Sequence, residues 1–215
     1  MKLERMVEDF RAALGWPYAS PGGTGRDCSR CGIDCSGMFV RAYRLQGETI
    51  AHGSNRIWRR YLSDKGVITS PELLEVGMAV FRHRAKDTAK YPDGEGDFYH
   101  IGLVVGVSPV RIVHASTNGN VVREDIGAEG WTHWGWLAAV EKTAGVKGCV
   151  TAAKGETVNI RRAPGGAVQD RLAIGSEVEI LRQADGWTRV RYTVERTGYV
   201  MDDYINRMDL EKKPE

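Results

Sequence analysis

Apolar residues recur at helical spacing in the first part of the chain. Residues 2–14 carry an apolar face, and residues 36–46 carry another after a break rich in Gly and Pro. Gly47 suits the position that follows a helix C-terminus. The pattern therefore predicts two amphipathic helices, and the apolar face of the first consists of Leu3, Met6, Val7, Phe10 and Leu14.

A third helix is predicted over residues 54–66, where Ser54 is a capping residue and Gly66 a terminating residue. A strand over residues 77–83 follows it. The next stretch, residues 85–97, is polar and predicts a long loop.

Two apolar runs, residues 98–107 and 111–117, are separated by a Ser-Pro pair and predict a β-hairpin. Side chains alternate between the two faces of a strand, so the length of the loop decides which residues share a face. A three-residue loop would place His100 and His114 on the same face, whereas an even loop would separate them. A last strand is predicted over residues 134–142.

From about residue 148 the pattern changes to short alternating strands separated by turns that contain Gly. This change predicts a small all-β barrel or sandwich. We place a first domain at residues 1–145, a second at 148–208 and a frayed tail at 209–215. The strands predicted for the second domain are 157–162, 177–183, 187–193 and 197–200.

Composition and charge exclude several classes of partner. The 215 residues are 42% hydrophobic and carry a formal net charge of +2, with no basic patch suited to nucleic acid. The longest apolar runs are too short to cross a bilayer, so we expect no membrane insertion. The charged, helical N-terminal stretch does not resemble a secretory signal, which indicates a protein made in the cytoplasm.

Cys35 stands at the start of the second predicted helix and is the first candidate for chemistry. A helix N-terminus carries unpaired N–H donors and a partial positive charge, and both lower the pKa of a thiol placed there. Asp34 and Ser36 are both capping residues, so either can begin the helix. The alternative interpretation is that Cys35 is an inert buried thiol.

A nucleophilic cysteine needs a base, and the base needs an orienting partner. His100 and His114 can supply these two functions if they share one face of the hairpin. The alternative is that each is a half-buried polar residue of a strand. The other three histidines, His52, His83 and His133, are interpreted as surface or loop residues.

The cysteine spacing also suggests a metal site. Cys28, Cys31 and Cys35 form a C-x2-C-x3-C pattern, and Cys149 stands alone. Structural zinc is usually bound by two Cys/His pairs with short internal spacing, and the sequence offers one. We therefore predict no metal. Cys28 and Cys31 either remain thiols or form a short-range disulfide.

In order along the chain, "LGWPYASPGG", "GIDCSGMFVRAY", "GMAVF", "HIGLVVG" and "IVHAST" resemble the NlpC-type cell-wall cysteine peptidases. The resemblance covers residues 1 to about 140. It implies an α+β, papain-like fold with an antiparallel sheet and the catalytic cysteine at a helix N-terminus. Carried over, Cys35 is the nucleophile, His100 the base and His114 the orienting residue, in agreement with the assignment from the helix and the hairpin.

Three further residues acquire candidate roles from this resemblance. Asp34 and Ser36 match positions that shape the site for a free amine or for the peptide stem. Tyr18 matches a tyrosine near the oxyanion. The chain departs from the family in its extra cysteines and in the long loop before the histidine strand, and such inserted loops often set substrate preference.

The long loop, together with "HGSNRI" after the second helix, looks like lysins of phages and mobile elements of Gram-positive bacteria. The missing signal peptide fits release by a holin. The second domain resembles bacterial Src-homology-3-like modules through "TVNIRRAPGG", "IGSEVEIL", "DGWTRVRY" and "TGYVMDDYI". This implies wall binding by Trp187 and Tyr199. The alternatives are that both rings pack the barrel, or that the module covers the catalytic groove.

The resemblance as a whole implies a peptidoglycan hydrolase that acts on the cell wall without a cofactor, and we expect it to be a monomer. It implies a cysteine endopeptidase that cuts stem peptides between γ-D-glutamate and diaminopimelate or lysine. Two alternatives stay open within the same chemistry, an N-acetylmuramoyl-L-alanine amidase and an acyltransferase. A third is a non-catalytic wall-binding protein with a degenerate site.

Overall fold

The computed structural model describes residues 1–24, 27–141, 146–162, 164–184, 186–192 and 196–207. The chain divides into two compact units, Met1–Lys142 and Thr143–Glu215. The tail predicted at residues 209–215 lies outside the described residues. In the described part of the chain, no helix is both long and apolar enough to span a membrane.

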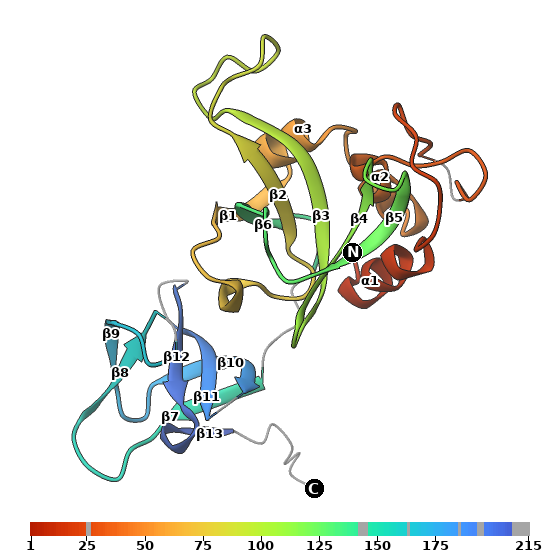
Figure 1. The fold of residues 1–215 in the computed structure, drawn as a ribbon. Coiled ribbons are helices and arrows are strands. Elements are labelled where there is room, and N and C mark those ends of the chain that lie inside the picture. Colours follow the sequence, from red (N-terminus) through yellow and green to blue (C-terminus); the bar gives the residue numbers. More distant parts are fainter. Residues whose placement is uncertain (25–26, 142–145, 163, 185, 193–195, 208–215) are drawn as a thin grey trace, which may run out of the picture. The chain divides into compact units, whose positions relative to one another are not determined.

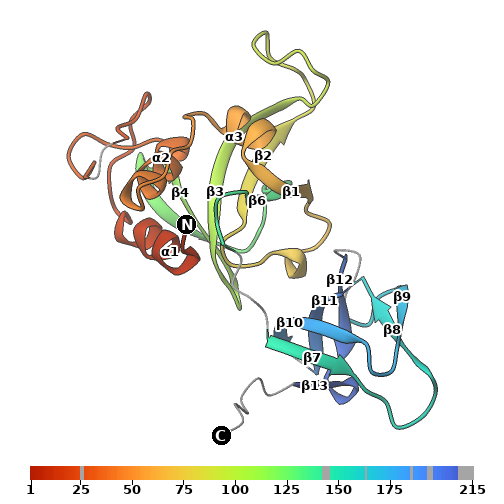
Figure 2. The same cartoon turned by 180° about the vertical axis from the view of Figure 1, so that it is seen from behind.

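The N-terminal unit is built on one antiparallel sheet of six strands in the order β1-β6-β2-β3-β4-β5. Three helices lie on one face of this sheet (Figures 1 and 2). Helices with an antiparallel sheet make the fold α+β, as predicted. The helices are α1 (Leu3–Ala12), α2 (Cys35–Leu45) and α3 (Ser54–Arg60), and the strands are β1 (Leu62–Val67), β2 (Ala79–Arg84), β3 (Asp97–Val107), β4 (Val110–Ser116), β5 (Val121–Ile126) and β6 (His133–Leu137).

Both faces of the sheet are buried. Between the sheet and the helices, Phe10 of α1 and Phe39 of α2 meet edge to face and join the main core. The opposite face carries a smaller cluster that includes Trp131 and Trp136. The prediction for α1 is wrong at its end, because Leu14 lies beyond the helix and is 42% exposed.

The third predicted helix is correct only in its first half. Gly53 caps α3 and Ser54 is its first residue, whereas residues beyond 61 form β1 against β6. Gly66 does not end a helix but faces Trp134 of β6, where a Cβ would lie 3.2 Å from the indole nitrogen. Pairing with β6 therefore overrides the local helical pattern.

The predicted hairpin exists as β3 and β4, but its loop differs from the prediction. Val107 pairs with Val110, so the loop has two residues, Ser108 and Pro109. The register shifts between Val104 and Gly106, which makes Val105 the extra residue of a β-bulge. The bulge shifts the alternation of side chains between the two faces by one residue. It therefore places His100 and His114 on the same face, as a loop of odd length would have done.

The C-terminal unit is an antiparallel sheet of seven strands with its own core, which includes Ile160, Val190 and Val200. Three of its strands, β7, β9 and β13, were not predicted. The strand order is β13-β7-β10-β11-β12-β8-β9. The strands are β7 (Val146–Val150), β8 (Thr157–Arg161), β9 (Val168–Ala173), β10 (Glu177–Ala184), β11 (Trp187–Tyr192), β12 (Arg196–Met201) and β13 (Ile205–Arg207).

Candidate active site

Cys35 is the first residue of α2, and Asp34 is the residue that caps the helix. The Asp34 carboxylate accepts a hydrogen bond from the backbone N–H of Gly37 at 2.8 Å. It also accepts the Ser36 hydroxyl at 3.0 Å and the N–H of Gly22 at 2.8 Å. These hydrogen bonds to Asp34 fix the N-terminus of α2, and the Cys35 side chain lies at this end of the helix.

The Cys35 thiol reaches β3 where that strand separates from its neighbour. Strands β3 and β4 pair from Leu103 and Val113 outward to the turn, so Ile101 lies beyond the paired region. The backbone N–H of Ile101 is a hydrogen-bond donor to the Cys35 sulfur. Cys35 thus lies against the residue that follows His100 in β3.

The pKa of the Cys35 thiol is raised rather than lowered, contrary to the prediction. Burial and the adjacent Asp34 carboxylate raise its pKa to about 11. Backbone N–H groups of Ile101, Ser36 and Cys35 itself favour the thiolate, but they are outweighed. The position at a helix N-terminus was visible in the sequence, whereas the degree of burial was not.

His100 and His114 are brought together on one face of the sheet. His100 Nε2 and His114 Nδ1 are 2.7 Å apart. Gly102 makes room for the side chains around this contact, because a Cβ there would lie 2.8 Å from the Trp131 ring and 3.2 Å from the Cβ of His114. The Trp131 ring stacks on His100 and meets His114 edge-on. The two imidazoles are therefore held in one relative orientation.

Asp125 of β5 extends this pair and was missed in the sequence analysis. Its Oδ2 is 3.0 Å from His114 Nε2, and its Oδ1 accepts from Arg123 Nε at 2.8 Å. Burial opposes the charge, but His114 and Arg123 hold the pKa of Asp125 below its usual value. The Asn-Gly pair at residues 118–119 is a hairpin signal that could have revealed β5 and this carboxylate.

The carboxylate determines which nitrogen of each ring carries a proton. Ionised Asp125 can only accept, so His114 Nε2 donates and His114 Nδ1 must accept from His100 Nε2. This leaves Nδ1 of His100 as a free proton acceptor. Burial and the neighbouring His114 lower the pKa of His100 to about 3, which favours the neutral ring with Nδ1 unprotonated.

A second group of polar residues lies around the two sequence neighbours of the nucleophile, Asp34 and Ser36. His52 Nε2 is 2.9 Å from Asp34 Oδ2 and 3.4 Å from the Ser36 hydroxyl. The backbone of Tyr18 pairs with that of Ile33, two residues before Cys35. Burial raises the pKa of Tyr18, a hydrogen bond with Ser20 lowers it, and Cys35 and Asp34 raise it. Tyr18, Asp34 and Ser36 are thus assembled around Cys35, together with His52.

Other sequence candidates lie outside this cluster. His83 and His133 are not loop residues, because they stand in β2 and β6; both are partly exposed, with their rings against Phe98. Among the described residues, no group of three His, Cys, Asp or Glu side chains could hold a metal. Cys28 is buried and Cys31 exposed.

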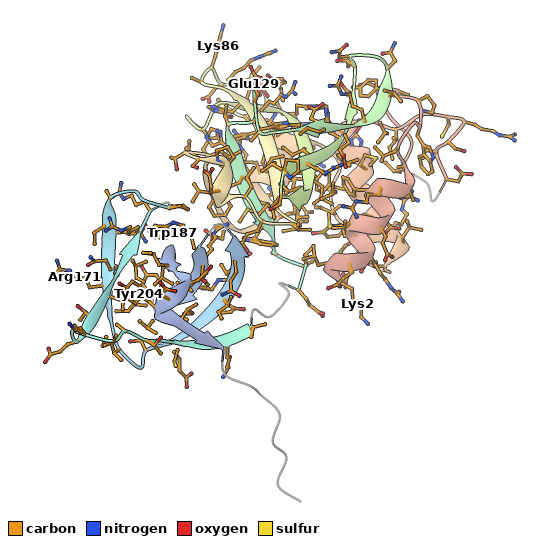
Figure 3. All side chains as sticks on the ribbon, turned by 60° about the horizontal axis from the view of Figure 1, so that its bottom comes forward. Lys2, Lys86, Glu129, Arg171, Trp187 and Tyr204 are labelled. Carbon is orange, nitrogen blue, oxygen red and sulfur yellow. The ribbon has the colours of Figure 1, made fainter. Side chains whose placement is uncertain are left out.

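The candidate wall contacts belong to the C-terminal unit. Trp187 and Tyr204, both labelled in Figure 3, line a cavity of about 240 Å³ there. Lys154, Arg161 and Met201 line the same cavity. The backbone of Tyr199 lies in β12, and its side chain is outside the described part of the structure.

No family model matches this sequence, and no curated protein matches it. Among solved structures, NlpC2 from Trichomonas vaginalis is similar with a TM-score of 0.47 and 21% identity over 63% of this chain. This chain covers 46% of the length of that protein. The P60 domain of the M. avium subspecies paratuberculosis antigen MAP1204 gives a TM-score of 0.44 and 17% identity, with coverage of 63% of this chain and 93% of the domain.

The structure of Ly7917 is similar along nearly the whole chain, with 96% of this chain and 98% of Ly7917 covered. The TM-score is 0.40 and the identity 17%. Ly7917 with the hydrolyzing product of MDP gives a TM-score of 0.37 and 16% identity, with coverage of 93% and 92% of the two chains. At these similarities the function must be argued from the geometry of the site.

Proposed function

We propose that the N-terminal unit is a cysteine peptidase that hydrolyses amide bonds in the stem peptides of peptidoglycan. Two observations carry the proposal: the hydrogen-bonded series His100–His114–Asp125, and the hydrogen bond to the Cys35 sulfur from the backbone N–H of Ile101, the residue that follows His100. Such a series leaves one imidazole nitrogen free to accept a proton, as a thiol nucleophile requires.

The reaction begins with two neutral partners. His100 Nδ1 takes the proton of the Cys35 thiol as the sulfur attacks the carbonyl carbon of the scissile amide. The tetrahedral intermediate collapses when the C–N bond breaks, and Nδ1–H gives its proton to the leaving amine. A thioester of Cys35 remains. Water then attacks its carbonyl carbon and gives a proton to His100, the C–S bond breaks, and the sulfur takes the proton back.

Negative charge develops on the carbonyl oxygen in both halves of this reaction. The backbone N–H of Cys35 has no carbonyl partner within α2, because it belongs to the first residue of the helix. Together with the Tyr18 hydroxyl, it can donate to this oxygen, and such donors stabilise the transition state by several kcal/mol in other enzymes. No cofactor takes part.

We assign the binding of the free amino end of the substrate to the part of the site around Asp34. Asp34 is a buried carboxylate, and the imidazole beside it, that of His52, is 41% exposed and can be displaced. A free amine at the end of a shortened stem peptide would take that place, with Ser36 and Tyr18 beside it. We assign the cut to the bond between γ-D-glutamate and the diamino acid, in a lysin of phage type. The cavity lined by Trp187 is the proposed contact of the C-terminal unit, a Src-homology-3-like module, with the wall.

The test is mass spectrometry of purified muropeptides incubated with the wild-type protein and with Cys35→Ala. We expect the wild type to shorten the stem after γ-D-glutamate and the variant to leave it intact. Separation of glycan from an intact stem would make the enzyme an amidase instead. If the wild type leaves every muropeptide unchanged, or if Cys35→Ala is equally active, the proposal is wrong.

A further inference from the structure

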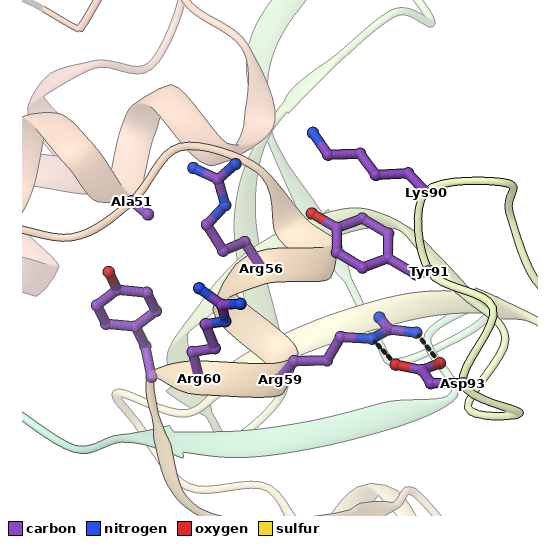
Figure 4. A pocket seen from close by; sticks show the side chains of 8 residues that line it. Ala51, Arg56, Arg59, Arg60, Lys90, Tyr91 and Asp93 are labelled. Carbon is purple, nitrogen blue, oxygen red and sulfur yellow. Dashed lines mark hydrogen bonds and ion pairs between the residues drawn. The ribbon is translucent and has the colours of Figure 1, made fainter.

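A second cavity, lined largely by cations, lies in the N-terminal unit between α3 and the loop at residues 85–96. Its volume is about 540 Å³. Arg56 and Arg60 extend from α3 and Lys90 from the loop toward the same space (Figure 4). Tyr61 and Tyr91 provide aromatic walls. The remaining lining residues are Ala51, Arg59 and Asp93.

One of the positive charges in this cavity is paired with a carboxylate, and the others are not. Asp93 is the one carboxylate in the lining, and Arg59 binds it through two hydrogen bonds, one of them 2.8 Å long (Figure 4). Within the described part of the chain, Arg56, Arg60 and Lys90 have no carboxylate within ion-pair distance. Three cations thus face one space without a counter-charge, an arrangement that favours an anionic ligand.

The loop that supplies Lys90 and Tyr91 is tied down on both sides. Within the loop, the Asp87 carboxylate accepts from the N–H groups of Gly94 and Gly96, both at 2.8 Å. From α3, Arg59 donates to the carbonyl of Gly96 at 2.9 Å and stacks over the Tyr91 ring. The cavity is therefore formed before any ligand arrives, which lowers the entropic cost of binding.

Residues that line or support this cavity are close in sequence to residues of the candidate active site. Ala51 lines the cavity, and the next residue, His52, touches the Asp34 carboxylate beside Cys35. On the other side, Asn55 of α3 donates to Asp97 at 2.7 Å and accepts from the N–H of Phe98, two residues before His100. A peptide bound across Cys35 could therefore extend into the cavity.

We propose that this cavity binds the carboxylates of the stem peptide next to the bond that is cut. The inference rests on the proposed function. The volume decides between the possible anions, because it is far larger than one phosphate and lies in the range that holds small organic ligands. Guanidinium groups form paired hydrogen bonds with carboxylates, and the stem offers one on the γ-linked glutamate and others further along.

The test compares the double variant Arg56→Gln/Arg60→Gln with the wild type on a synthetic stem peptide that has free carboxylates. We expect KM to rise by about tenfold while kcat changes by less than about twofold, because two charge-assisted contacts are lost away from the reacting atoms. The same peptide with amidated carboxylates should show a much smaller change. Arg5→Gln, an exposed arginine of α1, is the matched control and should leave KM unchanged.

Several results would overturn this inference without touching the proposed function. One is an active wild type whose KM is the same in the double variant, and another is an equal loss on free and amidated peptides. Binding is measured independently by titrating Cys35→Ala with the free peptide, with and without the two arginine changes. Inhibition by inorganic phosphate that needs both arginines, with KM for the peptide unaffected, would assign the cavity to phosphate. An inactive wild type would contradict the proposed function instead.

Discussion

The candidate site contains two histidine–carboxylate pairs, and their burial is opposite. In the pair His114–Asp125 the histidine is 1% exposed and the carboxylate 16% exposed. In the pair His52–Asp34 the carboxylate is 7% exposed and the histidine 41% exposed. The nitrogen–oxygen distances are nearly equal, 3.0 Å and 2.9 Å. Distance alone would therefore treat the two pairs as equivalent.

The two pairs differ in the number of side chains that contact them. His114 is held by His100, Asp125 and the Trp131 ring, and Asp125 is held in turn by Arg123 and Arg82. Among the described residues, the polar contacts of His52 are with the side chains of Asp34 and Ser36. The pair His114–Asp125 therefore orients the base His100 through a fixed hydrogen-bond acceptor. In the pair His52–Asp34, a ligand can displace the exposed histidine from the carboxylate.

The largest expected effect comes from Asp125→Asn. An amide can donate to His114 as well as accept from it, so the proton positions on both imidazoles are no longer fixed. We expect kcat to fall by about 10²-fold with KM nearly unchanged, at the low end for loss of a proton-transfer partner. Nitrogen-15 NMR of the histidines should show a changed tautomer of His114.

Glu124→Gln is the control for this variant, because Glu124 is on the same strand but pairs with Arg111 at the surface. It should keep kcat within about twofold of the wild type, as expected for a surface ion pair. If Asp125→Asn lowered only the thermal midpoint and left both kcat and the His114 tautomer unchanged, Asp125 would have a structural role alone.

The raised pKa of Cys35 predicts how its alkylation depends on pH. Below a pKa of about 11 the thiol is mostly protonated, so the thiolate fraction increases as the pH rises. We expect the rate of reaction with iodoacetamide to rise about tenfold per pH unit between pH 6 and 9. The rate is followed by mass spectrometry of the Cys35 peptide, because the exposed Cys31 also reacts. A rate that is constant across neutral pH would indicate a thiolate–imidazolium pair and contradict the assignment.

The smallest effect is expected from His52→Ala. Removing the exposed ring frees the Asp34 carboxylate for a substrate amine, while the base and its partners are untouched. We expect kcat to stay within about twofold and KM for a stem peptide with a free amine to fall by about two- to fivefold, the range of a weak ion pair. An N-acetylated peptide should show no change. A loss of kcat comparable to that of Asp125→Asn would mean that the two pairs act alike.

The sequence predicted the elements that carry the site better than the contacts between them. The helix that begins at Cys35 and the two histidine strands follow from local spacing, and they were found. Asp125 was missed because β5 was missed, although the Asn-Gly turn before it was visible. The raised pKa of Cys35 depends on burial by residues distant in sequence, which no local pattern encodes. The second half of the third predicted helix failed for the same kind of reason, since its partner β6 lies some 70 residues away.

The bulge at Val105 has a consequence for how this hairpin can vary in length. Arg11 of α1 donates to the carbonyl of Val105 at 2.8 Å and so supports the extra residue from outside the sheet. Inserting or deleting one residue between His100 and His114 would turn one imidazole to the opposite face, unless the bulge disappeared or a second one formed. Insertions or deletions of two residues would keep both rings together. Tolerated length changes in this hairpin should therefore come in steps of two.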